Sequence, residues 1–154
     1  RLIHRPKPGY DQATPSGNGV AAFALQRLGH LLGEPRYLSA AERTLKLFHP
    51  QMSQQPAGFM SLLAVLEEYV TPPAILILRG PAADVAEWKQ ALAREYLPRT
   101  LVLALPNELS DLPAAWTKPR SASVNAWLCR GVTCLPALTD RSEVLRLCKS
   151  GQLG

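Results

Sequence analysis

Polar side chains gather near the start of the chain, in residues 11–20, DQATPSGNGV. Asp11 offers a carboxylate for acid–base chemistry or for binding sugar hydroxyls, while Ser16 and Asn18, with Gly17 between them, offer hydroxyl and amide groups. The same residues can instead simply cap a helix that starts at about Val20. A phosphate loop is excluded because the Gly-Lys-Ser/Thr ending is absent. The stretch therefore predicts a ligand loop, with Asp11 as the candidate catalytic residue, or a helix cap.

A second chemical feature is the pair Cys129 and Cys134. If Gly131 and Val132 form a two-residue hairpin turn, the two cysteines lie opposite each other, near disulfide range. The spacing is compatible with a disulfide or redox pair, or with two reduced, half-buried thiols. A metal site is not expected, because no histidine neighbours the pair and Cys148 is isolated. Three cysteines in all argue against a secreted disulfide framework and favour the cytoplasm.

The remaining composition excludes several classes of protein. The histidines His4, His30 and His49 stand alone, and no hydrolase elbow, metalloprotease motif or dinucleotide fingerprint occurs. The net charge of +5 is spread over scattered basic residues, so we expect a solvated surface and no nucleic-acid partner. No apolar run of about 18 residues is present, so we expect no membrane partner. We also expect no cofactor. Because the first residue is Arg, we expect the chain to begin inside a longer protein.

Residues 1–70 have the pattern of an all-helical segment. Two stripes repeat the same helical spacing, one in residues 20–31 and one in residues 37–48, and Gly33 and Pro35 suit the link between two antiparallel helices. A third helix is expected from about Pro56. The predicted buried stripe of the first helix consists of Val20, Phe23, Ala24, Leu28 and Leu31. These helices form a small bundle or the last arc of a larger helical array.

Residues 74–154 alternate between strand and helix patterns, after Pro72 and Pro73. Two apolar runs, 74–78 and 101–105, predict buried strands joined by a helix over 82–96 with Tyr96 facing inward. A short helix over 107–116, a hairpin of strands over 124–129 and 132–138, and a helix capped by Asp140 complete the order β-α-β-(α)-β-β-α. This is the order of the thioredoxin fold, but no Cys-x-x-Cys follows the first strand. The predicted class is thus a mixed α+β chain: helical hairpins in 1–70, then a small α/β domain in 74–154.

Several parts of the sequence resemble one known family. They are residues 11–22, DQATPSGNGVAA, the helical stretches 28–37 and 41–48, and residues 127–140, WLCRGVTCLPALTD. These parts are similar to the spermatogenesis-associated protein 20-like family, which joins a thioredoxin-like domain to a six-hairpin (α/α) toroid. The chain departs from that family at Gln12, where glycine is usual, and at Gly19, where serine is usual. The resemblance covers nearly the whole chain in order.

The resemblance implies a C-terminal portion of a larger protein, whose partners are the rest of the parent chain. By analogy with N-acylglucosamine 2-epimerase-like toroids, the Asp11–Asn18 loop would line one wall of a sugar pocket. We expect the portion to be inert alone, with an exposed apolar helical face that also permits self-association. The alternative is a thiol- or redox-linked interaction or scaffold module. Whether the parent is an enzyme, carbohydrate-active or thioredoxin-linked, stays open.

Overall fold

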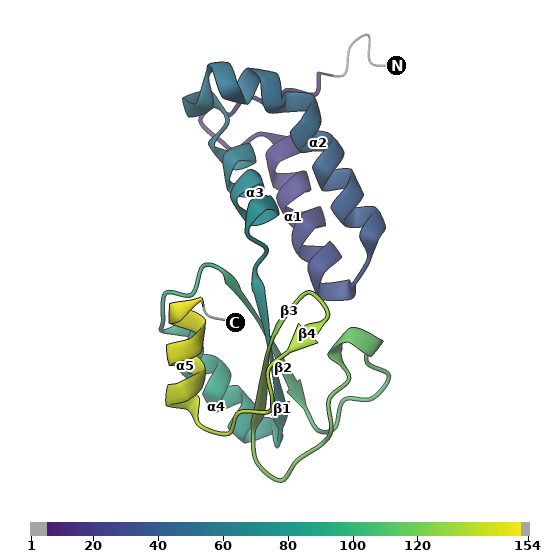
Figure 1. Ribbon diagram of the computed structural model, residues 1–154, viewed down its shortest axis with the longest axis vertical. Helices are drawn as coiled ribbons and strands as arrows, with labels where there is room; N and C mark the ends of the chain where they lie inside the picture. The colour runs from purple at the N-terminus through teal and green to yellow at the C-terminus, as the bar shows by residue number, and fades with distance from the viewer. Residues whose placement is uncertain (1–5, 152–154) are drawn as a thin grey trace. The chain divides into compact units, whose positions relative to one another are not determined.

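The computed structural model describes residues 6–151 and divides the chain into two compact units, Arg1–Thr71 and Pro72–Gly154. The described residues form five α-helices and a mixed sheet of four strands, with three of the helices preceding the sheet (Figure 1). The predicted class, a mixed α+β chain with its helices first, is confirmed.

The first unit consists of α1 (Gly17–Leu32), α2 (Pro35–Gln54), the 3-10 turn η1 (Pro56–Gly58) and α3 (Met60–Val70). Gly33 ends α1 with a positive φ of 67°, a backbone conformation that glycine adopts without steric cost, and Pro35 starts α2. The three helices pack on one another around a core of apolar residues: Ala22, Ala41, Leu45, Met52, Phe59, Leu62 and Val65.

The predicted buried stripe of α1 is wrong at Val20, Ala24 and Leu28, which are exposed, while Phe23 packs against the core as expected. The buried positions of α1 are Gly19, Ala22, Gln26 and Gly29, whereas Val20 is 55% exposed and Leu28 is 43% exposed. A side chain at Gly19 would collide with Ser61, and one at Gly29 would collide with Leu38, so small residues let the neighbouring helices approach closely. Phe23 and Leu25 pack at the edge of the core, whereas Val20, Ala24 and Leu28 are exposed on what we call the α1 outer face.

The second unit consists of β1 (Ala74–Gly80), α4 (Ala82–Ala93), β2 (Thr100–Pro106), the 3-10 turn η2 (Ala114–Trp116), β3 (Asn125–Arg130), β4 (Thr133–Cys134) and α5 (Arg141–Ser150). The strand order is β2-β1-β3-β4: β1 pairs parallel with β2 and antiparallel with β3, which pairs antiparallel with β4. Helices α4 and α5 cover one face of the sheet, where Val85, Leu92 and Val144 pack against the strands (Figure 1).

Three local predictions in this unit are wrong. The expected helix over 107–116 is reduced to η2, in a segment interrupted by Pro113. The expected strand over 132–138 is reduced to β4 and one bridge at Leu138, because Pro136 cannot donate to a ladder. Tyr96, expected inside, lies beyond the end of α4 and is 87% exposed. The cap of the last helix is confirmed, since the side chain of Asp140 accepts from the Ser142 amide.

Candidate functional site

The carboxylate of Asp11 ties the N-terminal loop to the first turns of two helices. Its Oδ1 atom accepts from the Ser16 amide at 2.7 Å and from the Ser61 hydroxyl at 2.5 Å. Its Oδ2 atom accepts from the Ser61 amide at 2.7 Å. Ser61 lies in the first turn of α3, where backbone N–H groups lack partners within the helix. Asp11 therefore supplies at α3 what a capping side chain supplies at other helices.

The same contacts determine the ionisation of Asp11. Burial by itself raises the pKa of Asp11, but the hydrogen bonds from Ser61 and Ser16 outweigh it and lower the pKa below its ordinary value. A carboxyl group with a lowered pKa is ionised at neutral pH and is a poor general acid. Both of its oxygens are also already engaged within the protein. In this unit Asp11 thus holds the loop rather than offering a proton.

The other predicted ligand residues of the loop also make local contacts. Ser16 is the N-cap of α1, and its hydroxyl accepts from the Gly19 amide at 3.1 Å. The Asn18 side chain donates to the Pro8 carbonyl at 2.8 Å, while an added Cβ at Gly17 would meet nothing within 4 Å. The helix starts at Gly17, three residues before the predicted Val20. No sequence motif pointed to Ser61, which lies far from Asp11 along the chain.

An open depression lies beside this loop. It is lined by Tyr10–Pro15 from the loop and by Ala57, Gly58, Met60 and Ser61 from η1 and the start of α3. The loop is held here by close packing, since a side chain at Gly58 would collide with the ring of Tyr10. The residues that line this depression are of both kinds: polar ones such as Gln12 and Thr14 and apolar ones such as Ala57 and Met60.

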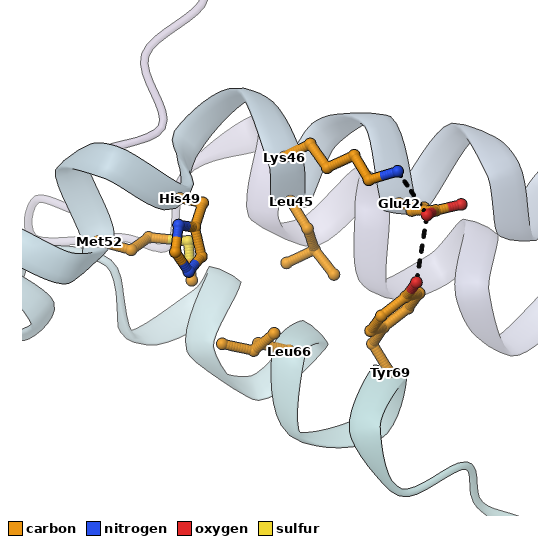
Figure 2. Close-up of a pocket in the computed structure, with 7 residues that line it drawn as sticks. All are labelled: Glu42, Leu45, Lys46, His49, Met52, Leu66 and Tyr69. Atoms are coloured by element: carbon orange, nitrogen blue, oxygen red, sulfur yellow. Dashed lines mark hydrogen bonds and ion pairs between the residues drawn. The ribbon is translucent and has the colours of Figure 1, made fainter.

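A second pocket, of about 140 Å³, lies between α2 and α3 (Figure 2). Leu45, Met52 and Leu66 form its apolar part, and His49 lies beside Met52. The sequence analysis did not single out this pocket. Its signal was present, however: Glu42, Leu45, His49 and Met52 follow helical spacing and therefore share one face of α2.

The polar end of this pocket is internally paired. The Oε1 atom of Glu42 accepts from Lys46 Nζ at 2.7 Å and from the Tyr69 hydroxyl at 3.2 Å (Figure 2). The hydrogen bonds from Lys46 and Tyr69 lower the pKa of Glu42. The Glu42 carboxylate is ionised and already bonded to Lys46 and Tyr69 at this end of the pocket. The rest of the pocket therefore presents an apolar interior.

The second unit carries the cysteine pair on its β3–β4 hairpin. The register pairs Cys129 with Cys134 around a two-residue turn, with Gly131 at φ 58°, and the two sulfurs form a disulfide. Cys129 is 4% exposed and Cys134 is half-buried. Lys118, which the sequence did not point to, reaches the pair from the connection after η2, with Nζ at 3.4 Å from Cys134 Sγ. Burial raises the pKa of the free thiol of Cys148.

The remaining candidates are not brought together. His30 lies in the last turn of α1, His49 lies in the α2–α3 pocket, and His4 falls outside the described residues. Within residues 6–151, no group of three or more histidine, cysteine or acidic side chains is placed to hold a metal ion. None of the helices in this same range has the length and apolar character needed to cross a membrane.

Comparison of the chain with protein-family models, with curated proteins and with solved structures yields no match.

Proposed function

We propose that the chain is a catalytically inert portion of a larger thioredoxin-domain protein, in which its helical unit packs against further helical hairpins of an (α/α) toroid. The α1 outer face carries this proposal. Val20 and Leu28 remain exposed although they alternate with the small residues that pack inside the unit. Exposed apolar faces of this kind mark interaction sites. In our proposal, a helical hairpin of the parent chain covers this face.

The chemistry of the loop supports the inert character of the portion. Asp11, the candidate catalytic residue, is ionised, so it has no proton to deliver, and both of its oxygens already accept hydrogen bonds from Ser16 and Ser61. The depression beside it is open, and Gln12 and Thr14 are among the residues that line it. We propose that it forms one wall of a sugar pocket that the parent protein completes. The strand order β2-β1-β3-β4 supports a thioredoxin-like arrangement of the second unit.

Sedimentation velocity over a range of chain concentrations tests the packing face. When the hairpin partner is absent, a second copy of the chain covers the same face, so we expect concentration-dependent association. The double substitution Val20→Ser and Leu28→Ser is expected to abolish it. The matched control is Leu47→Ser, because Leu47 is 68% exposed on α2 and lies off this face. A wild-type chain that stays monomeric at all concentrations would contradict the proposal. So would a Leu47→Ser control that loses the association as fully as the double variant does.

The sugar wall has its own test. We expect an N-acetylhexosamine to shift the amide resonances of residues 10–15 and 57–61, with no turnover of the sugar. Thr14→Val keeps the size of the side chain, removes a hydroxyl from the depression and should weaken the shifts. If the sugar moves no resonance in these two segments, the sugar-wall part of the proposal is wrong.

A second candidate function, a thiol- or redox-linked interaction module, is favoured by the Cys129–Cys134 disulfide. Thiol counting on the unfolded chain decides it. We expect one reactive thiol, Cys148, without prior reduction and three after it. Three thiols without reductant would show that the pair is not oxidised in solution.

A further inference from the structure

The surroundings of the two bonded sulfurs differ, which gives them different chemistry. Cys129 is 4% exposed in the middle of the sheet, and its Sγ atom lies 3.9 Å from the Trp127 carbonyl. Cys134 is half-buried and follows Val132 and Thr133, which are exposed at the tip of the hairpin. A thiol or disulfide approaching from solvent therefore reaches Cys134 before it reaches Cys129.

A positive charge lies beside the more accessible sulfur. Lys118 Nζ is 3.4 Å from Cys134 Sγ and 5.8 Å from the centre of the Trp127 ring. The contact with the ring helps to hold the ammonium group in this place. An ammonium group at this distance stabilises a thiolate, and thiolates that are partly exposed beside a cation are the reactive ones.

We propose that Cys129 and Cys134 form a reversible dithiol–disulfide pair in which Cys134 is the attacking sulfur, Lys118 stabilises its thiolate, and Cys129 resolves the mixed disulfide. The inference rests on the second candidate function. The co-reactant is a disulfide of a small thiol or of a protein, and the return reaction uses a dithiol reductant.

The exchange balances in two steps. The Cys134 thiolate attacks one sulfur of R–S–S–R′, forming Cys134–S–S–R and releasing R′–S⁻, which takes a proton from water. The Cys129 thiol then gives its proton to solvent, and its sulfur attacks Cys134 Sγ and releases R–S⁻. The chain loses two electrons and the small disulfide gains them. The direct pairing of Cys129 with Cys134 in the hairpin register places the resolving sulfur for the second step.

Cys148 takes no part in this exchange. It lies on α5, which packs against the sheet face formed by Leu76, Leu78 and Leu128. Cys129 follows Leu128 in β3 and therefore points to the opposite face. Cys148 thus serves as an internal reference thiol in any experiment on the pair.

The test uses the reduced whole chain and follows alkylation of each cysteine by iodoacetamide at neutral pH with mass spectrometry. We expect Cys134 to react about ten times faster than Cys129 and Cys148. Lys118→Met should slow Cys134 several-fold without changing Cys148, and Lys118→Arg should restore the rate. The matched control is Lys89→Met, which removes an exposed lysine from α4. Faster reaction of Cys129, or no effect of Lys118→Met, would overturn the assignment.

Trapping provides a second readout that does not depend on rates. With glutathione disulfide, the Cys129→Ala chain should accumulate a stable glutathione adduct on Cys134, whereas Cys134→Ala should form little adduct on Cys129. The reverse pattern would overturn the roles of the two sulfurs. If a dithiol reductant cannot open the disulfide in the folded chain, the second candidate function itself fails, which distinguishes the two failures.

Discussion

At the scale of single residues, Asp11 is a structural group. It accepts three hydrogen bonds that join the N-terminal loop to α1 and α3. We expect Asp11→Ala to lower the free energy of unfolding by about 2 kcal/mol, because the Ser16 and Ser61 amides lose their acceptor. Since the folded pKa lies below the ordinary 3.8, this contribution is present at neutral pH and is lost as the pH falls through the folded pKa.

Urea unfolding of the variant, followed by helical circular dichroism, checks the magnitude for Asp11. Gln12→Ala changes the neighbouring exposed residue of the same loop and serves as the control. Equal stability of the Asp11→Ala chain and the wild type would mean that Asp11 does not hold the loop.

His30 also makes the stability of the helical unit depend on pH, at a higher pH than Asp11 does. Burial lowers the pKa of His30 below its ordinary 6.5, although the charge of Glu68 acts in the other direction. The unfolded chain then binds a proton that the folded chain does not, so stability falls as the pH drops below about 6.5. We expect His30→Gln to flatten this decline in unfolding experiments across the pH range. A wild-type curve that is flat in this range would contradict the argument.

Arg79 is a buried cation whose described partners are backbone carbonyls. It is 3% exposed at the end of β1, and its guanidinium donates to the carbonyls of Pro106, Asn107 and Leu109. Arg79→Met leaves these acceptors without their donor, and we expect the second unit to lose about 3 kcal/mol of stability. Chemical denaturation monitored by tryptophan fluorescence measures the loss, with the exposed Arg99→Met as control. A loss no larger than that of the control would show that water replaces the guanidinium.

At the scale of elements, the packing of α1 depends on two glycines. A Cβ at Gly19 would lie 2.1 Å from Ser61 Oγ and 2.7 Å from Ser61 Cβ. We expect Gly19→Ala to cost about 2 kcal/mol of stability through overpacking, despite the higher helix propensity of alanine. Gly17→Ala is the matched control, because an added Cβ there meets nothing within 4 Å, and a small gain is expected. Thermal unfolding of both variants compares them, and equal effects would refute the close approach of α1 and α3.

The same helix shows how far the sequence could predict the fold. The bounds of β1 and β2 follow closely from apolar runs, and the start of α4 follows from the Gly80-Pro81 break, whereas α4 ends at Ala93, before the predicted end. The inner face of α1 was not predictable in this way, because spacing arguments rank positions by hydrophobicity whereas this interface buries small residues. The short β4 and the irregular connection before β3 depend on proline residues, which interrupt strands and helices that apolar spacing alone predicts.

For the candidate sites, the sequence could predict only contacts that are local along the chain. Ser16 and the Cys129–Cys134 pairing lie within a few residues of their partners, so spacing was informative. Ser61 is far from Asp11 in the sequence. Lys118, which contacts Cys134, comes from a segment without regular structure. Their roles depend on tertiary packing, which no motif in the chain encodes.

At the scale of the whole molecule, each unit has its own apolar core, and the described residues that join them include Thr71 and Pro72. The second unit uses its helices to cover one face of its sheet. The first unit instead leaves the α1 outer face exposed, although Val20 and Leu28 are as apolar as residues in its core. This imbalance, rather than any single reactive residue, is the main support for our proposal that the helical unit packs against further helices.

Methyl NMR of the isolated chain at increasing concentration tests this claim most directly. We predict that the methyl resonances of Val20 and Leu28 shift and broaden together, because association covers the α1 outer face. The methyl groups of Leu47 and Val132, which are exposed elsewhere, should stay unchanged. Shifts confined to Leu47 or Val132, or no concentration dependence at any of these methyl groups, would contradict the account.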